Sequence, residues 1–273
     1  GSVYRLVDEK TGRMMENPVR SVLSGGQPIR RHEHGLLRRR DGRQIPAQDS
    51  AAPIRSHEGF IMGVVLVIHD VTVTLNLSRE LTYQARHDVL TGILNRRAFE
   101  ECLTHLLDGA FESDTHHVLG YLDLDQFKVI NDTCGHEAGD EALRQITALL
   151  GRHVRSADVL ARLGGDEFGL LLRDCPMDKA CQVAEAMRQS VQDFRFAWQD
   201  KSFSLGISIG LVGIGEGHGS LAALLSAADS ACYAAKEAGR SQVHVYQPDD
   251  QHLLEQHGQV QWVSRLQSAL DED

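Results

Sequence analysis

The sequence predicts an α/β domain in which a central sheet is flanked by helices, preceded by a smaller antiparallel sheet and a connecting helix. Three observations lead to this prediction. Residues 34–70 alternate strand-like runs with turn signals, a second hairpin with an acidic tip is centred on residues 162–168, and segments with helical spacing surround it. A chain of 273 residues is long enough for one large domain or two small ones.

The composition is that of an ordinary globular protein, with 42% hydrophobic and 24% charged residues. The five cysteines are scattered and form no C-x-x-C pair, so we expect reduced thiols, no disulfide and no zinc site. The longest apolar run, residues 61–68, is far too short to span a membrane. We therefore expect this stretch of chain to be cytoplasmic, and leave open an inner-membrane anchor elsewhere in the parent protein.

The net charge of −10 is unevenly distributed along the chain. Residues 1–80 carry 12 basic and 9 acidic side chains, whereas the remainder carries 16 basic and 29 acidic ones. Such an acidic region repels polyanions, so we expect no DNA or RNA partner. It can still bind a nucleotide through a metal ion.

The first 73 residues are predicted to form a three-stranded antiparallel sheet. Strand-like runs at 34–40, 44–55 and 60–70 are separated by Asp-Gly and Glu-Gly, which are hairpin signals. The pattern L-x-R-R-D-G-R-x-I-P, followed by G-V-V-L-V-I-x-D-V-T, resembles the C-terminal half of a PAS sensor domain, with Glu16-Asn17-Pro18-Val19 as a helix start. The resemblance implies a partial PAS domain over residues 1–73. Most of its ligand pocket would lie upstream, so the PAS ligand is unknown.

Residues 74–87 are predicted to form a connecting helix. Leu77, Leu81 and Ala85 recur at helical spacing, and the segment contains no Gly or Pro. The apolar stripe is narrow, which suits a stalk that pairs with a second copy. The alternative is a helix that lies on its own domain.

The central motif is Gly164-Gly165-Asp166-Glu167, between strand-like runs at 159–161 and 168–172. Glycines can adopt positive φ in a tight hairpin turn and let a ligand lie against the backbone. Two adjacent carboxylates repel each other unless a cation lies between them, which favours a divalent metal site. The alternative is an ordinary solvated acidic turn.

A third carboxylate follows the buried-strand run at 118–122. Asp123 at the end of that run is placed to meet the acidic hairpin, and three carboxylate ligands suit Mg²⁺ or Mn²⁺. We expect Asp125, two residues further on, to point to the opposite face and to have a structural role. Lys128 begins a helical segment where phosphate oxygens could be received.

Three separated motifs identify a family. D-x-L-T-G-x-x-N-R-R from Asp88, D-x-D-x-F-K-x-I-N-D-x-x-G-H-x-x-G-D from Asp123 and R-x-G-G-D-E-F from Arg162 resemble the GGDEF domain of diguanylate cyclases, over residues 84–248. The resemblance implies a palm-like α/β domain, placed here at residues 88–248, with a mainly antiparallel sheet. It implies that GTP is condensed to cyclic di-GMP by a homodimer.

The resemblance also implies residue roles. The catalytic residues would be Asp166, Glu167 and Lys236. The metal ligands would be Asp123, Leu124 through its carbonyl, Asp166 and Glu167. The substrate-binding residues would be Phe127, Lys128, Asn131, Asp140, Gly164, Gly165 and Arg240. A carboxylate such as Asp140 accepts hydrogen bonds from the guanine edge that adenine lacks, so GTP is preferred over ATP. His136 is expected to be structural.

A product-inhibition site is implied by Arg155 and Asp158, which form an R-x-x-D motif shortly before the acidic hairpin. Arg155 could grip a phosphate or a guanine edge of cyclic di-GMP in a bidentate manner. Related proteins often add a second arginine, but Ala186 occupies the position expected for it. This departure weakens the expected inhibition.

The remaining helices are predicted at 140–150, 177–191 and 221–238, the last with a C-terminal cap at Gly239. Residues 203–210 alternate with period two and are predicted to form one half-buried strand. Lys236 and Arg240 are four residues apart and are predicted to share a helix face that contacts terminal phosphates.

The tail at 249–273 contains W-x-x-x-L-x-x-A-L, which resembles the lead-in helix of an EAL phosphodiesterase domain. The parent protein would then be a PAS-GGDEF-EAL hybrid, and the tail a linker helix toward a missing EAL partner domain. A plain amphipathic helix is the alternative. Beside the cyclase, two further functions stay open: a GTP-binding regulatory module without turnover, and a cyclic di-GMP receptor.

Overall fold

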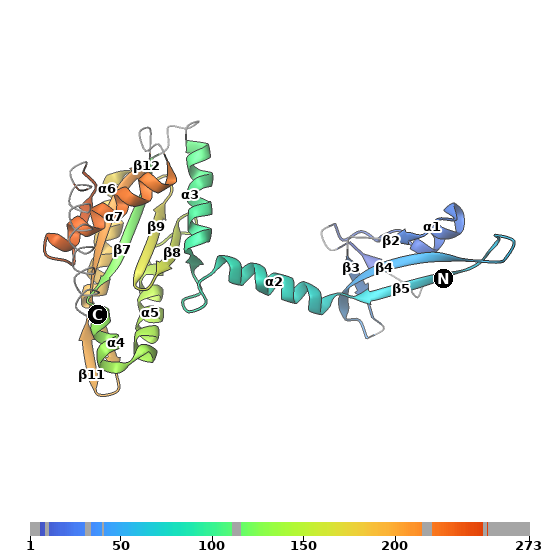
Figure 1. The fold of residues 1–273 in the computed structure, drawn as a ribbon, viewed down its shortest axis with the longest axis horizontal. Helices are drawn as coiled ribbons and strands as arrows, with labels where there is room; N and C mark the ends of the chain where they lie inside the picture. The colour runs from blue at the N-terminus through green and yellow to red at the C-terminus, as the bar shows by residue number, and fades with distance from the viewer. Residues whose placement is uncertain are drawn as a thin grey trace, which may run out of the picture. The chain divides into compact units, whose positions relative to one another are not determined.

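The computed structural model describes residues 6–8, 11–30, 34–39, 41–110, 116–214, 220–247 and 250. Two compact units follow each other along the chain, unit 1 at residues 1–83 and unit 2 at residues 84–273 (Figure 1). Apart from Asp250, the predicted tail helix at 249–273 lies outside the described residues.

Unit 1 is an antiparallel sheet organised around one long strand, β4. Both predicted hairpin turns are confirmed, and Gly42 and Gly59 each have a φ of 86° there. The predicted helix start at Asn17 is also confirmed, because its side chain accepts a hydrogen bond from the Val19 N–H at 3.0 Å. The elements are β1 (Leu6–Val7), α1 (Pro18–Gly25), β2 (Ile29–Arg30), β3 (Gly35–Arg38), β4 (Gln44–Arg55) and β5 (Ile61–Asp70). Strands β2, β3 and β5 all pair with β4, and β1 pairs with β3.

The predicted connecting helix is α2 (Thr72–Arg86). It starts where the Asp70 carboxylate accepts the Thr72 N–H at 3.0 Å. None of its residues is buried, and the apolar stripe of Val73, Leu77 and Leu81 is 59–70% exposed. No helix in the described ranges is both long and apolar enough to cross a bilayer.

Unit 2 is built on a six-stranded sheet with the order β13-β12-β7-β9-β8-β6 (Figure 1). The three inner pairings are antiparallel and the two edge pairings are parallel, which confirms the predicted mainly antiparallel sheet. The strands are β6 (Leu94–Asn95), β7 (His117–Asp125), β8 (Val159–Gly164), β9 (Glu167–Leu172), β12 (Gly206–Ile214) and β13 (Val243–Val245). The central strand β7 is buried along nearly its whole length.

Helices cover both faces of this sheet and divide the core into two clusters. Residues such as Phe168, Ile146 and Met187 form one cluster, and Phe99 and Leu119 belong to the other. The helices are α3 (Arg96–Ala110), α4 (Lys128–Cys134), α5 (His136–Gly151), α6 (Met177–Asp193) and α7 (Leu221–Glu237). The cluster with Phe168 contains α5 and α6 residues, whereas the other contains α3 and α7 residues.

A bare glycine sets the height of α7 above the sheet. A Cβ on Gly210 of β12 would lie 2.2 Å from the Cys232 backbone nitrogen and 2.4 Å from the Ala228 carbonyl oxygen. Such distances are impossible for a side chain, so only glycine lets α7 pack this closely. The C-terminal end of α7 is thereby held near the end of β7.

The predicted single strand at 203–210 is wrong. Residues Lys201–Ser204 form β11, which pairs with β10 (Arg195–Trp198) in a separate two-stranded sheet, and β12 begins only at Gly206. Phe203 packs on Phe196 with ring centroids 6.4 Å apart. Ser208, between the apolar residues Ile207 and Ile209 of the alternating pattern, is fully buried. Strand β12 is therefore buried on both faces rather than half-buried.

Candidate active site

The acidic hairpin β8–β9 has the predicted tight turn. Gly164 pairs with Glu167, so Gly165 and Asp166 form a two-residue tip. Gly165 has a φ of 47°, but Gly164 lies outside the positive-φ region, which corrects the expectation for both glycines. Gly164 needs no positive φ because it pairs with Glu167 and precedes the two turn residues.

Arg162 stabilises this tip through hydrogen bonds to its backbone. Its guanidinium donates to the Gly165 carbonyl oxygen at 2.8 and 2.9 Å and pairs with the Asp88 carboxylate at 3.1 Å. Hydrogen bonds to a charged group and burial of both partners make this a stronger contact than a surface ion pair. The first and third sequence motifs of the family therefore meet in one ion pair.

The three predicted carboxylates share one edge of the sheet. Asp123 on β7 lies directly opposite Glu167 on β9, and the Leu124 N–H donates to the Asp166 carbonyl oxygen at 3.3 Å. The Lys236 ammonium lies 2.6 Å from Asp123 Oδ2. The pKa of Asp123 is raised to about 6, chiefly by burial and further by the charges of Asp166 and Glu167, while Lys236 acts in the opposite direction. Negative charge is thus in excess at this edge.

Glu167 has three neighbours that sequence reasoning missed. The Arg96 guanidinium lies 3.7 Å from its carboxylate, and the Tyr121 hydroxyl is hydrogen-bonded to it. Burial, followed by the charge of Glu167, raises the pKa of Tyr121 and also that of Asp229 on α7. Arg96 belongs to the N-R-R part of a motif, whereas Tyr121 and Asp229 carry no local signal in the sequence.

The donor chemistry at this edge fits a hard divalent cation. Asp123, Asp166, Glu167 and the Leu124 carbonyl supply only oxygen atoms, from β7 and the adjacent β8–β9 hairpin. Burial, together with repulsion from neighbouring carboxylates, raises the pKa values of Asp123 and Asp166. Among the described residues, no three His, Cys, Asp or Glu side chains already converge as ligands of one metal ion. Lys236 is the cation that contacts Asp123 in this arrangement.

A cavity of about 270 Å³ adjoins the acidic edge, between the hairpin tip and helices α4 and α5. Most of the residues predicted to bind the nucleotide line this cavity, but Gly164 and Arg240 do not. His136, expected only to be structural, also faces it, as do two residues absent from the predictions, Leu143 and Arg162. The complete lining is Phe127, Lys128, Asn131, His136, Asp140, Leu143, Arg162, Gly165 and Asp166.

The predicted shared helix face of Lys236 and Arg240 is wrong. Helix α7 ends at Glu237, and Arg240 has a φ of 63° in the turn beyond it. The predicted cap at Gly239 is confirmed: the Gly239 N–H donates to the Lys236 carbonyl and the Arg240 N–H to the Ala235 carbonyl, as in a Schellman motif. The chain thus turns before Arg240 could continue the helical stripe.

Asp125 anchors the same turn and has the structural role predicted for it. Its carboxylate accepts hydrogen bonds at 2.8 Å from both the Ser208 hydroxyl and the Ser241 N–H. It is 7% exposed. The expected opposite face is wrong, because side chains two residues apart in a strand share a face, and Asp125 contacts Ser208, which lies opposite Asp123 on β12. The position of Arg240 therefore depends on a residue far earlier in the chain.

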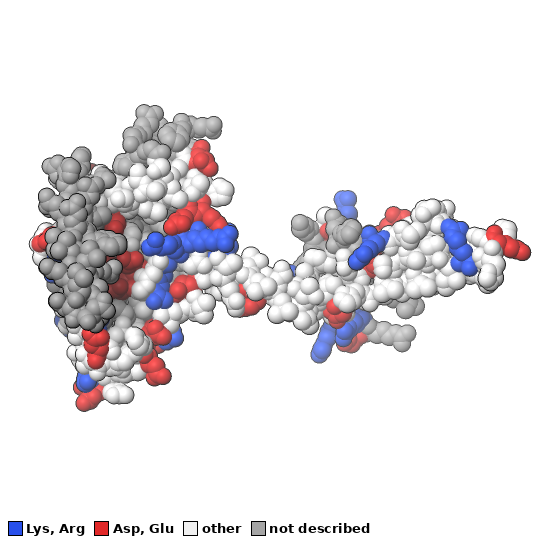
Figure 2. All heavy atoms as spheres, viewed as in Figure 1, with Lys and Arg blue, Asp and Glu red and all other residues white. Residues whose placement is uncertain are grey.

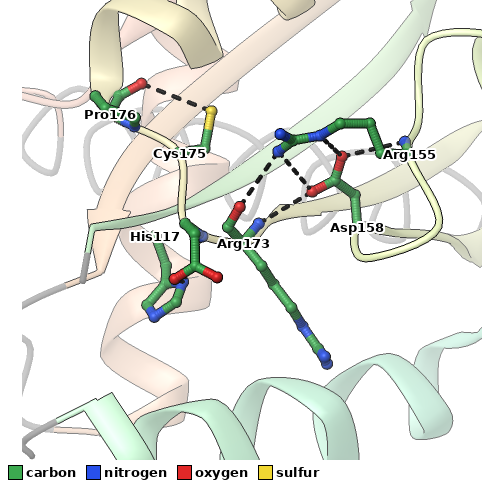
Figure 3. Close-up of polar contacts among 7 residues, drawn as sticks. His117, Arg155, Asp158, Arg173, Cys175 and Pro176 are labelled. Atoms are coloured by element: carbon green, nitrogen blue, oxygen red, sulfur yellow. Dashed lines mark hydrogen bonds and ion pairs between the residues drawn. The ribbon is translucent and has the colours of Figure 1, made fainter. Parts of the chain in front are cut away.

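Arg155 and Asp158 form a closed pair (Figure 3). The Asp158 carboxylate accepts hydrogen bonds from Arg155 Nε at 2.9 Å, from the Arg155 N–H at 3.1 Å and from the Arg173 N–H at 3.2 Å. Burial favours the neutral form of Asp158, but these hydrogen bonds outweigh it and hold its pKa below the usual value. The Arg173 side chain extends away from the pair in Figure 3.

A cavity of about 340 Å³ adjoins this pair, and its lining includes Arg155 and Ala186. The two positions that the sequence linked to product inhibition are therefore neighbours. Lys179 and His153 line the same cavity. This second site thus combines an exposed Arg155 side chain with a partner carboxylate, Asp158, whose hydrogen bonds are already made.

The charge of unit 2 is spread rather than clustered on the face seen in Figure 2. Acidic side chains are scattered over this face, and one group of basic side chains lies near the start of α3. Near that position, Arg86 and Arg97 both pair with Glu101 at 3.3 Å. The single carboxylate of Glu101 therefore balances one of these two positive charges.

Comparison with known proteins connects this geometry to a family. The family model "Diguanylate cyclase, GGDEF domain" matches residues 85–242, and a model described as "PAS fold" matches residues 2–75. The probable diguanylate cyclase DgcE of Escherichia coli K12 is 42% identical over 213 residues, which is 78% of this chain and 19% of DgcE. The cyclic di-GMP phosphodiesterase PdeB of Shewanella oneidensis is 36% identical over 228 residues, 82% of this chain and 26% of PdeB.

The chain thus spans about a fifth to a quarter of the length of these two relatives. Among solved structures, the coiled coil and GGDEF domain of DgcB from Caulobacter crescentus, in complex with c-di-GMP, matches with a TM-score of 0.61 and 28% identity. That match covers 64% of this chain and 93% of DgcB's chain. The matched family model spans more than half of the chain, so this chain belongs to the family of GGDEF-domain diguanylate cyclases, with a PAS fold preceding the family's domain.

Proposed function

We propose that unit 2 condenses two GTP molecules into cyclic di-GMP and releases pyrophosphate. The main observation behind this proposal is that the cavity adjoins the acidic edge. Gly165 and Asp166 line the cavity, and the Asp166 carbonyl oxygen accepts a hydrogen bond from Leu124 of β7. A GTP molecule whose guanine occupies the cavity would therefore place its phosphates near the carboxylates. Membership in the cyclase family supports the same reading.

The cavity has the groups needed to select guanine. The Asp140 carboxylate can accept hydrogen bonds from N1–H and N2–H₂ of guanine, and the Asn131 amide offers both a donor and an acceptor. Adenine would leave the Asp140 acceptor unpaired, which costs affinity. Phe127 contributes an apolar wall and Lys128 a positive charge for phosphate oxygens.

The acidic edge is where the phosphoryl transfer would occur. Asp123, the Leu124 carbonyl, Asp166 and Glu167 would hold Mg²⁺ or Mn²⁺, which neutralises the triphosphate and favours ionisation of the attacking 3′-hydroxyl. The 3′-oxygen of one GTP forms a bond to the α-phosphorus of the other while the bond to pyrophosphate breaks. Glu167, whose side chain is 35% exposed, is proposed to accept the hydroxyl proton as well. Lys236 is proposed to contact the phosphates, and Arg240 to approach them from the turn beyond α7.

A homodimer follows from the symmetry of the product. Each unit 2 has one guanine cavity, and cyclic di-GMP consists of two equal halves, so two copies must face each other around a two-fold axis. The exposed stripe of Val73, Leu77 and Leu81 on α2 supports pairing of two chains through this helix. Unit 1 is proposed to control that pairing.

Arg155 and Asp158 are proposed to form a product-inhibition site. The side chain of Arg155 is 62% exposed and borders a cavity, so its guanidinium can also donate hydrogen bonds to a phosphate or guanine of the ligand. Ala186 in the same wall supplies no charge. We therefore propose that inhibition by cyclic di-GMP is weaker here than where a second arginine is present.

A second candidate function is a GTP-binding module that regulates a neighbouring EAL domain without turnover. The similarity to PdeB, whose name is that of a phosphodiesterase, favours it. The intact carboxylates and Lys236 favour the cyclase. A cyclic di-GMP receptor acting through Arg155 would not need the carboxylates.

The test is incubation of the protein with GTP and Mg²⁺ at several protein concentrations, followed by chromatography of the nucleotides. Cyclic di-GMP formed at a rate steeper than linear in protein concentration is expected for a dimeric cyclase. GTP binding without product at any concentration would replace the cyclase with the regulatory module. Binding of cyclic di-GMP without GTP binding would indicate the receptor.

A further inference from the structure

Gly139 lies in the first turn of α5, next to Asp140 of the proposed guanine cavity, and its backbone does not explain why it is glycine. Its φ lies outside the positive region, and the residue is buried within a regular helix. Glycine within a helix costs about 1 kcal/mol relative to alanine. Something other than backbone conformation must therefore require the missing side chain.

The side chains opposite Gly139 supply that requirement. A Cβ at this position would lie 1.9 Å from Asn131 Oδ1, 2.9 Å from Asn131 Cγ and 3.2 Å from Phe127 Cζ. The amide of Asn131 thus occupies the space that any other residue would fill. Asn131 and Phe127 both line the cavity, as does Asp140, the next residue of α5.

Asn131 has few ways to yield to a methyl group. Its side chain is short, so rotation about its bonds would carry the amide away from α5 and change its position in the cavity. The Asn131 backbone cannot follow, because its carbonyl oxygen accepts the Gly135 N–H at 2.9 Å at the end of α4. A side chain at 139 would therefore alter the cavity before it altered the helix.

We propose that Gly139 is a positioning residue for base binding: its bare Cα keeps the Asn131 amide in the position from which it contacts guanine. The inference rests on the proposed function, since it assigns the cavity to the guanine of GTP. Gly139 itself touches no substrate atom and is a positioning residue that acts through Asn131. The Asn131 amide can hydrogen-bond to the base only while Gly139 leaves the space beside it free.

The first test compares Gly139→Ala with wild-type protein. We expect KM for GTP to rise about tenfold, the usual effect of losing one hydrogen bond to a bound ligand, with kcat changed much less. The matched control is Gly151→Ala at the other end of α5, where an added Cβ would meet nothing within 4 Å. An unchanged KM in Gly139→Ala, or an equal rise in both variants, would overturn the proposal.

A double-mutant cycle identifies the residue through which Gly139 acts. In the Asn131→Ala background, Gly139→Ala should leave KM unchanged, because the amide it displaces is already absent. Gly139→Ala should also raise the melting temperature more in that background than in wild-type protein, since the helix-favouring methyl then meets no amide. A further KM increase in the double variant, or an equal temperature shift in both backgrounds, would contradict the contact.

The two readouts separate this inference from the proposed function. Absence of GTP binding and turnover in wild-type protein would count against the proposed function alone. The melting-temperature comparison needs no nucleotide and still decides whether Asn131 depends on Gly139.

Discussion

Two cation–carboxylate pairs in unit 2 have similar distances, but the pKa values of their carboxylates shift in opposite directions. Lys236 lies 2.6 Å from Asp123, and Arg155 Nε lies 2.9 Å from Asp158. The pKa of Asp123 is raised to about 6 by burial and neighbouring carboxylates, whereas hydrogen bonds hold the pKa of Asp158 below its usual value despite burial.

The number of donors explains this contrast. Asp158 accepts three hydrogen bonds from Arg155 and one from the Arg173 N–H, and these bonds together with the charge of Arg155 lower its pKa. Asp123 has Lys236, but the charges of Asp166 and Glu167 oppose it. A satisfied carboxylate stabilises a loop, while an under-compensated one retains affinity for a further cation. The following predictions test this distinction.

The largest expected effect is on catalysis, from Glu167→Gln. Removing one carboxylate charge from the acidic edge should lower cyclic di-GMP synthesis by roughly 10³-fold, the scale of losing a key electrostatic group in an active site. GTP binding should persist because the cavity is intact. Product formation and GTP affinity are measured together, with Glu58→Gln in an exposed turn of unit 1 as the control. Synthesis within tenfold of wild type would show that Glu167 is outside the reaction.

The next largest effect is on stability, from Asp158→Ala. The change leaves the Arg155 and Arg173 N–H groups without their acceptor, so the free energy of unfolding should fall by about 2–4 kcal/mol. Urea unfolding of unit 2 measures it. Asp200→Ala, at an exposed position between β10 and β11, should stay within about 0.5 kcal/mol of wild type. Equal behaviour of both variants would contradict the structural role of Asp158.

The same pair predicts a pH dependence. Because the pKa of Asp158 is lower in the folded state, its contribution is fully present above the unfolded pKa of about 3.9 and is lost as pH falls through the folded value. The difference in unfolding free energy between wild type and Asp158→Ala should be constant above about pH 5 and shrink below about pH 4. A difference that stays constant into strong acid would mean that the carboxylate charge contributes nothing.

Much of unit 2 was predictable because its signals are local. The acidic hairpin, the strand that ends at Asp123 and the cap at Gly239 each depend on a few adjacent residues, and the structure has all three. The spacing of motifs also predicted most of the cavity, since Asn131 and Asp140 belong to one continuous pattern. Local turn chemistry and helical periodicity were sufficient for these features.

The errors and omissions concern packing between distant segments. Arg240 leaves the helical stripe in a turn anchored by Asp125, and the break before β12 depends on pairing with β10. Tyr121 and Asp229 approach Glu167 only after β7 has paired with β9 and α7 has packed on the sheet. The Cβ space beside Gly139 likewise depends on how α4 meets α5. No local pattern encodes these approaches.

The smallest effect should come from Lys236→Met, which removes the cation of the under-compensated pair. Synthesis should fall about tenfold, the equivalent of 1.4 kcal/mol, because a positive charge beside the phosphates is lost. The free energy of unfolding should change by less than about 1 kcal/mol, since Asp123, with a pKa of about 6, can take up a proton near neutral pH when its partner is gone. Lys201→Met, in β11, serves as the control in both synthesis assays and urea unfolding. A stability loss as large as that of Asp158→Ala would make Lys236–Asp123 a structural pair of the same kind and remove the contrast between the two sites.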